Sequence, residues 1–180
     1  MPEWPWWNVK DRKMTIFDGG EVPFEASSLS QVAKTIVNIL SPQRLEETKN
    51  QYVFTHSATL TQNSLLSIFE DLTGSKWNTT ANSVKAINAI GKESFRRLTN
   101  NKSLDELRKD ETLEGLGNVL DFQISIVMMI SSGCFGLGGG NQFGEKAKYW
   151  TQQLRLVEED VESVLREALA DQIQVVKGKA

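Results

Sequence analysis

The 180-residue sequence is poor in metal-binding and disulfide-forming side chains, because it contains one cysteine, Cys134, and one histidine, His56. A single cysteine cannot form an intramolecular disulfide. One cysteine with one histidine also excludes a zinc site of the usual composition. We therefore expect no metal site, and the cysteine usage is typical of a reducing, cytoplasmic compartment.

An excess of positive charge is also lacking, since 20 Lys and Arg stand against 23 Asp and Glu, a formal net charge of −3. No basic tract is present to neutralise a run of phosphates, so we expect no nucleic-acid partner.

The N-terminal residues MPEWPWWNVKDRK have no apolar core of the length that a signal peptide needs. The mostly apolar segment 119–137 contains Asp121, Gln123 and three serines. These polar groups are costly inside a bilayer, so the segment predicts a buried helix rather than a membrane span.

What the sequence does contain is a succession of short β-rich and amphipathic patterns, which predicts a mixed α/β fold. Alternating or β-branched residues predict strands at 14–17, 52–56 and 77–80. Helices are predicted at 29–40, with Ser27 or Ser28 as the N-cap, and at 62–73, followed by Gly74. We expect one domain with a mixed α/β part at 1–80, a helical lobe at 81–172 and a flexible tail at 173–180.

Both predicted helices carry apolar residues at helical spacing, which indicates that these residues face the core. In the first helix they are Leu29, Val32, Ala33, Ile36, Val37 and Leu40, and in the second Leu65, Leu66, Ile68, Phe69 and Leu72. Further helices are predicted at 116–130, 145–156 and 158–170, with the acidic run 158–160 as a solvated helix start.

The stretch GCFGLGGGNQFG, residues 133–144, contains six glycines and raises the question of a phosphate-binding loop. The dinucleotide fingerprint G-x-G-x-x-G does not fit, because the sixth position fails whether the count begins at Gly136 or at Gly138. The loop also follows a predicted helix rather than a strand. A phosphate cradle is therefore the least favoured interpretation.

Two other interpretations of this loop stay open. In the first, Gly138 and Gly139 give the backbone freedom to close over a ligand, while Phe135 and Phe143 supply apolar contacts. In the second, the loop only connects two helices and the phenylalanines are ordinary core residues.

Three further features each carry a functional and a structural interpretation. His56 is either a general acid or base at a strand end or a hydrogen-bonded structural residue. The cluster Trp4, Trp6 and Trp7 either lines an aromatic substrate pocket or covers exposed core. Cys134 is interpreted as structural, because nothing cationic flanks it to lower its pKa.

Five motifs in order resemble the C-terminal half of isoflavone-reductase-like proteins of the NmrA-like family. Members share a strand ending in YDGG, a helix that crosses back to the sheet, a YVF strand, a SQNEIL-like helix and then TGEKW. Here the corresponding segments are FDGG at 17–20, the helix at 29–40, YVF at 52–54, TQNSLL at 61–66 and TGSKW at 73–77. The resemblance covers roughly residues 9–170.

The family consists of atypical short-chain dehydrogenases in which an N-terminal Rossmann half holds NADP or NAD and carries a catalytic lysine. The resemblance implies that this chain lacks that half, so we expect no catalytic residue and no bound cofactor in the chain alone. It implies the substrate-binding portion of an NAD(P)-dependent oxidoreductase, with short strands that complete a Rossmann-type sheet and a helical lobe that binds a small apolar or aromatic metabolite. The predicted substrate contacts are Trp4, Trp7, His56, Phe135, Gly138, Gly139 and Phe143.

Other functions stay open at this point. Relatives in the family include non-catalytic redox sensors that bind dinucleotide and regulate partners, and a helical interaction module from a truncated gene is a third possibility. Without a Rossmann half, the strands at 14–17 and 52–55 would form an exposed sheet edge and the helix at 29–40 would lack part of its cover. We therefore expect self-association.

Overall fold

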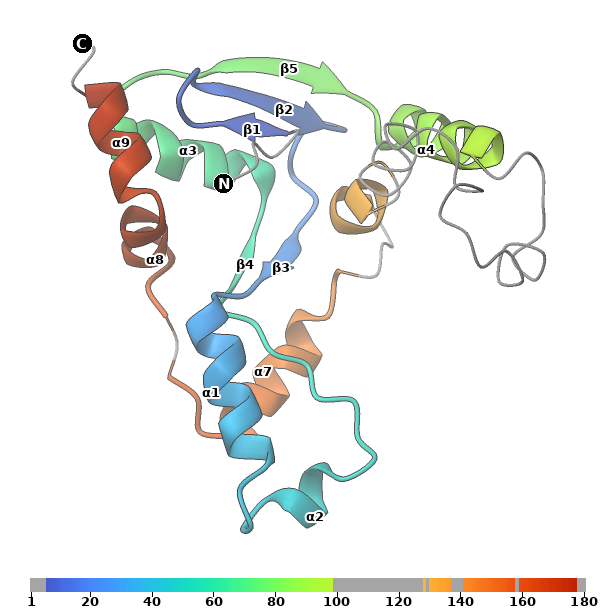
Figure 1. The fold of residues 1–180 in the computed structure, drawn as a ribbon, viewed down its shortest axis with the longest axis vertical. Coiled ribbons are helices and arrows are strands. Elements are labelled where there is room, and N and C mark those ends of the chain that lie inside the picture. Colours follow the sequence, from blue (N-terminus) through green and yellow to red (C-terminus); the bar gives the residue numbers. More distant parts are fainter. Residues whose placement is uncertain (1–5, 99–127, 129, 137–140, 158, 178–180) are drawn as a thin grey trace.

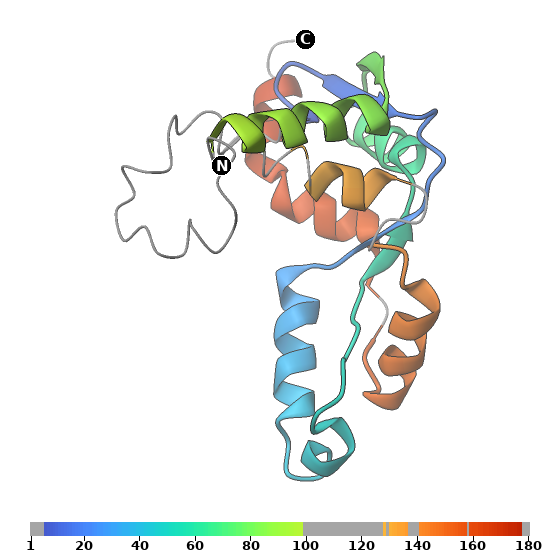
Figure 2. The ribbon, with the colours of Figure 1, turned by 90° about the vertical axis from the view of Figure 1, so that its right-hand side faces the viewer.

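A computed structural model of the chain describes residues 6–98, 128, 130–136, 141–157 and 159–177, and it confirms the mixed α/β fold class. The elements are β1 (Trp7–Asn8), β2 (Lys13–Phe17), β3 (Phe24–Ala26), α1 (Leu29–Ile39), α2 (Leu45–Thr48), β4 (Ala58–Leu60), α3 (Gln62–Thr73), β5 (Asn78–Asn82), α4 (Val84–Leu98), α7 (Gly144–Gln153), α8 (Val161–Ala168) and α9 (Ala170–Lys177). In Figures 1 and 2 the strands β1, β2 and β5 lie in an upper part with α3, α4, α8 and α9, while α1, α2 and α7 form a lower lobe. The pair β3 and β4 connects the two.

The upper sheet has the strand order β1-β2-β5, with β1 antiparallel and β5 parallel to β2. The expectation that residues 14–17 form an open edge is wrong, because β2 is the central strand. Beyond the short β1, the side chain of Gln62 makes the hydrogen bonds to the backbone of β2 that a neighbouring strand would otherwise make. Its Oε1 accepts from the backbone N–H of Phe17 at 2.8 Å and its Nε2 donates to the carbonyl of Thr15 at 2.9 Å. The predicted strand at 77–80 corresponds to β5.

The second sheet pairs β3 with β4 in antiparallel register, so that Glu25 lies opposite Thr59. The strand predicted at 52–56 is wrong, since residues 51–56 form no strand and the pairing begins two residues later, at Ala58. The predicted strand lacks a pairing partner, because β3 ends at Ala26 and the chain then continues into α1. The apolar segment before β4 therefore has no strand beside it.

The starts predicted for α1 and α3 are confirmed, along with the end of α3. The Ser28 side chain caps α1 by accepting from the backbone N–H of Gln31 at 2.9 Å. Thr61 and Ser64 form a reciprocal capping box at the start of α3. Gly74 ends α3 in the left-handed conformation with φ of 65°, which glycine adopts without steric cost.

The apolar core lies in the upper part, between the sheet and the helices that pack against it. Its buried residues are Trp6, Val9, Met14, Phe17, Phe24, Leu65, Phe69, Leu72, Trp77, Ile87, Phe135, Leu169 and Ile173. The predicted inner face of α3 is thereby confirmed at its main positions. The tail predicted at 173–180 begins inside α9, where Ile173 continues the apolar stripe of Leu165 and Leu169 and is buried.

The predicted inner face of α1 is wrong, although the helix itself is where the periodicity placed it. Leu29 is 88% exposed and Val37 is 72% exposed, whereas Gln31 and Thr35 are buried. The lower lobe holds α1 through polar groups, since the Thr35 hydroxyl hydrogen-bonds that of Thr55 at 2.9 Å. The apolar stripe faces outward, which confirms the expectation that this helix lacks part of its cover.

Several predictions fall outside the described residues. They concern Trp4, the glycines at 138–140 and most of the helix predicted at 116–130. Within the described ranges, no helix is long and apolar enough to cross a bilayer.

Candidate functional site

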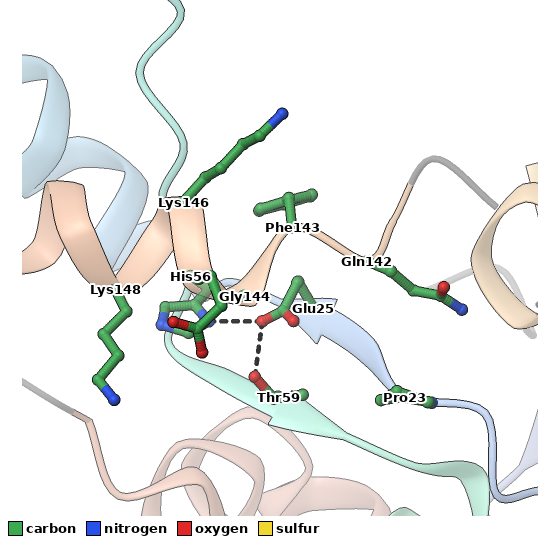
Figure 3. Close-up of a pocket in the computed structure, with 10 residues that line it drawn as sticks. Pro23, Glu25, His56, Thr59, Gln142, Phe143, Gly144, Lys146 and Lys148 are labelled. Carbon is green, nitrogen blue, oxygen red and sulfur yellow. Dashed lines mark hydrogen bonds and ion pairs between the residues drawn. The ribbon is translucent and has the colours of Figure 1, made fainter. Parts of the chain in front are cut away.

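A cavity of about 570 Å³ lies where β3, the start of β4 and the start of α7 converge. Figure 3 shows the side chains around it. The lining residues are Pro23, Glu25, His56, Thr59, Gln142, Phe143, Gly144, Glu145, Lys146 and Lys148. Three segments that are distant in the sequence therefore contribute to one site.

Glu25 reaches this cavity because strand side chains alternate between the two faces of a sheet. Phe24 turns into the apolar core, so Glu25 turns to the opposite face, where its side chain is only 3% exposed. The register of β3 and β4 places Thr59 directly across from it. The Thr59 hydroxyl donates to Oε2 of Glu25 at 2.9 Å, and Nδ1 of His56 lies 2.5 Å from the same oxygen.

The end of the glycine-rich stretch is attached to β3 by two hydrogen bonds that involve Asn141. The backbone N–H of Glu25 donates to the carbonyl of Asn141 at 3.1 Å. In return, the side-chain amide of Asn141 donates to the carbonyl of Glu25 at 3.0 Å. This pairing places Gly144, three residues later, beside the Glu25 side chain.

Gly144 is the first residue of α7 and its missing side chain permits the close approach to Glu25. A Cβ atom at Gly144 would lie 2.7 Å from Oε1 of Glu25, which is shorter than real Cβ contacts. The carboxylate thus lies beside the start of a ten-residue helix. The positive end of a helix dipole stabilises a negative charge at that position.

The Nδ1 edge of the His56 ring is hydrogen-bonded to Glu25, and the side chain lines the cavity. Its side chain is 17% exposed. An ionised carboxylate only accepts hydrogen bonds, so in the neutral imidazole Nδ1 carries the hydrogen and Nε2 carries the lone pair. Among the described residues, no hydrogen bond reaches Nε2. Both sequence hypotheses for His56 are therefore compatible with its place: it is hydrogen-bonded and it lines the pocket.

Phe143 supplies an aromatic ring to the lining of the cavity and packs on Phe54, which does not line it. The rings of Phe143 and Phe54 have centroids 5.2 Å apart, and Nζ of Lys146 lies 5.1 Å from the centroid of the Phe54 ring. Figure 3 shows Lys146 and Lys148 extending in different directions from α7. The cavity is therefore bordered by apolar ring surface and by separate polar groups.

The structure brings two of the predicted substrate contacts together and leaves two others elsewhere. His56 and Phe143 line the cavity. Phe135 is buried in the core, where its ring stacks on Phe17 with centroids 5.6 Å apart, and Trp7 packs on Phe69. Trp4, Gly138 and Gly139 lie outside the described residues.

Glu25 and Thr59 are the residues that sequence reasoning missed. The signal for Glu25 was the alternation in PFEA, where a glutamate between two apolar residues marks the other face of a strand. No comparable signal exists for its partners, because 31 positions separate Glu25 from His56 and 34 separate it from Thr59.

A second acidic group, Glu159, is partly buried, and it corrects the prediction of a solvated run at 158–160 at that position. The side chain of Glu159 is 11% exposed, and its Oε2 accepts from the hydroxyls of Ser28 at 2.5 Å and Ser57 at 2.7 Å. Lys34 pairs with Oε1 at 3.2 Å. These hydrogen bonds hold the pKa of Glu159 below its usual range. Asp160 does start a helix, since its carboxylate caps α8.

Neither a cluster of metal ligands nor an activated thiol is found among the described residues. The described residues contain no group of three or more His, Cys, Asp or Glu side chains that could hold a metal ion. Burial raises the pKa of the Cys134 thiol, which disfavours the reactive thiolate. This agrees with the structural interpretation of Cys134.

Comparison with known proteins relates part of the chain to an oxidoreductase. The chain is 31% identical over 81 residues to "Oxidoreductase poxI" of the fungus Penicillium oxalicum, and equally to the protein of that name from a second strain. The aligned segment is 45% of this chain and 25% of the fungal protein, so the chain matches about a quarter of the length of these relatives. No family model matches, and no solved structure matches.

Proposed function

We propose that the chain is the substrate-binding portion of an NAD(P)-dependent oxidoreductase of the isoflavone-reductase-like, NmrA-like type, acting on a small apolar or aromatic metabolite. The observation that carries the proposal is the cavity of about 570 Å³ in which a buried carboxylate contacts the His56 ring and the Phe143 ring forms part of the lining. Ligand sites in proteins are typically concave and largely apolar, with a few fixed polar groups. The partial identity to a fungal oxidoreductase supports the reaction class.

The described residues do not fit a dinucleotide. A Rossmann cradle needs a glycine turn that leads from a strand into a helix and leaves its backbone open to the pyrophosphate. The glycines after β2 lead instead to β3, and the space at Gly20 is filled, since a Cβ there would lie 2.5 Å from Oδ1 of Asn63. In this proposal the cofactor is bound by a Rossmann half outside this sequence, and the chain contributes the substrate pocket.

Calorimetric titration with NADPH and NADH tests the cofactor part of the proposal. We expect no binding of either nucleotide in the micromolar range. A dissociation constant of micromolar or tighter would contradict the assignment of the chain to the substrate side.

The substrate part can be tested through His56, because the only histidine of the sequence gives uniquely assigned imidazole signals in an NMR spectrum. We expect small aromatic compounds to shift these signals in a saturable manner. The substitution Phe143→Ala should weaken that binding severalfold, because it removes the ring that packs on Phe54. The exposed Tyr149, which lies on the same helix but does not line the cavity, provides the matched control Tyr149→Phe. Shifts that are absent, or unchanged by Phe143→Ala, would contradict the proposal.

A further inference from the structure

The strand β5 forms an open edge of the upper sheet. Among the described residues it pairs only with β2, and Figure 1 shows it at the margin of the fold. All of its residues are exposed. The other side of β2 differs, because the short β1 and then the side chain of Gln62 bond to its backbone. The sheet can therefore be extended at β5.

The hydrogen bonds to β2 show which backbone groups of β5 point outward. The N–H of Asn78 donates to the carbonyl just before β2 at 2.8 Å, and the carbonyl of Asn82 accepts from the N–H just after β2 at 3.1 Å. Successive residues of a strand direct their backbone groups to alternate edges, so Thr80 also faces β2. Thr79 and Ala81 face away. Among the described residues, no hydrogen bond reaches the N–H and C=O groups of these two.

The edge also lacks the features that commonly prevent one sheet from pairing with another. Such edges are usually protected by a charged side chain, a proline or a bulge. The sequence of β5, NTTAN, contains no charge and no proline. Its register with β2 runs without interruption, which excludes a bulge. The edge can therefore accept another strand along its whole length.

The sequence of β5 favours a second copy of itself as that strand. It is nearly the same in both directions, with Asn78 and Asn82 at the ends and Thr80 in the centre. Two copies related by a twofold axis at Thr80 would pair antiparallel, with Thr79 of each opposite Ala81 of the other. Since both residues face outward, each such pair exchanges two N–H···O=C hydrogen bonds.

The charges at the two ends of β5 are complementary in this arrangement. The strand begins shortly after the C-terminal end of α3, where the exposed Asp71 lies, and it ends at the start of α4, where the exposed Lys85 lies. Each charge is unfavourable beside the dipole of its own helix. Antiparallel pairing brings the start of β5 in one copy beside the end of β5 in the other. Each helix end then approaches an end of opposite sign.

We infer that the chain forms a twofold-symmetric dimer in which two β5 strands pair antiparallel about Thr80 and join the two upper sheets into one. The isologous contact uses the same five residues on both copies. This inference goes beyond the proposed function, because it involves neither the cavity nor a cofactor.

The first experiment reads the strand in the wild-type chain by amide hydrogen exchange, with sedimentation equilibrium to define the monomer and the dimer. The amides of Thr80 and Asn82 face β2 and should exchange slowly in both states. The amides of Thr79 and Ala81 should exchange quickly in the monomer and slowly in the dimer. Fast exchange of Thr79 and Ala81 in a dimeric sample overturns the inference, and so does a chain that is monomeric at all concentrations.

The second experiment blocks the edge with Thr79→Pro. Proline is tolerated at an edge position whose N–H points away from the sheet, so the melting temperature of the dilute chain should not change. We expect the dissociation constant of the dimer to rise about tenfold or more, because each copy loses one hydrogen-bond donor and gains a ring at the contact. The matched control is Thr80→Val, which keeps every backbone group and should leave the dissociation constant nearly unchanged.

The exposed face of α1 offers a competing contact between copies, since Val37 and Leu40 are exposed there. The double variant Val37→Gln and Leu40→Gln separates the two. A specific dimer that persists in this double variant and is weakened by Thr79→Pro supports pairing at β5. A dimer that the double variant abolishes and Thr79→Pro leaves intact overturns it.

Discussion

Oε2 of Glu25 lies 2.5 Å from Nδ1 of His56, and the same oxygen accepts the Thr59 hydroxyl at 2.9 Å. The contact joins β3 to the segment before β4, and Gly144 closes over it from α7. The buried charge, the imidazole and the helix start therefore depend on one another, which makes the site sensitive to changes at each of them.

Gly144→Ala should damage the site through crowding. The new methyl group would lie 2.7 Å from Oε1 of Glu25, so either the carboxylate or the start of α7 must move. We expect a loss of about 1–3 kcal/mol in the free energy of unfolding, measured by urea denaturation. Gly133→Ala is the matched control, because nothing lies within 4 Å of its Cβ position and alanine favours a helix. Equal effects of the two changes would contradict the close approach.

Glu159→Gln should destabilise the chain near neutral pH and have little effect in acid. The pKa of Glu159 lies below its usual range because of hydrogen bonds from Ser28 and Ser57. Its contribution is therefore present above the unfolded value of about 4.3 and is lost as the pH falls through the lower folded value. We expect a difference of about 2 kcal/mol from wild type near neutral pH in urea unfolding.

The matched control for this change is Glu162→Gln, whose carboxylate is half-exposed and pairs with Arg166 on the same helix. Its effect should stay below about 0.5 kcal/mol. A gap between wild type and Glu159→Gln that persists unchanged in acid would show that the carboxylate charge is not the cause.

Cys134 should react slowly with alkylating reagents in the folded chain. Burial raises the pKa of its thiol, so little thiolate is present near neutral pH. Alkylation followed by mass spectrometry should be slower than for free cysteine and should accelerate in denaturant. A rate in the folded chain that exceeds that of free cysteine would indicate an activated thiol and contradict the structural interpretation.

The outward face of α1 should make the isolated chain associate. Leu29, Val37 and Leu40 are largely exposed on this helix, and apolar patches of this kind promote association. We expect concentration-dependent light scattering and binding of an apolar dye, both reduced in the double variant Val37→Gln and Leu40→Gln without a loss of melting temperature. A stable monomer that binds no dye would contradict this prediction.

Local sequence signals predicted the helices α1, α3, α7 and α8 and the strands β2 and β5. Ser28, the Thr61 capping box and Gly74 act within a few residues of the chain, so their sequence patterns determine where α1 and α3 begin or end. The periodicity of α1 was equally clear, but periodicity identifies an apolar face and not its partner. Nothing described in the chain covers that face, so the assignment to the core failed.

The candidate site was only partly predictable, because its contacts are long-range. His56 stood out as the single histidine, and Phe143 stood out at the end of the glycine-rich stretch. The partners of Glu25 became visible only when β3 and β4 were paired in register, and the strand at 52–56 failed for the same reason, since its partner ends at Ala26. Pairing between distant segments depends on the whole fold rather than on local pattern.

The most direct test of the account is an isotope-filtered NMR experiment on the ¹³C-labelled chain with unlabelled 2-naphthol. The ligand should show nuclear Overhauser contacts to the imidazole of His56 and to the ring of Phe143, which line the same cavity. The exposed stripe of α1 is the competing place for an aromatic molecule, since Val37 is 72% exposed there. Contacts to His56 and Phe143 would confirm the pocket beside Glu25 as the ligand site. Contacts only to Val37 and its neighbours on α1 would contradict it.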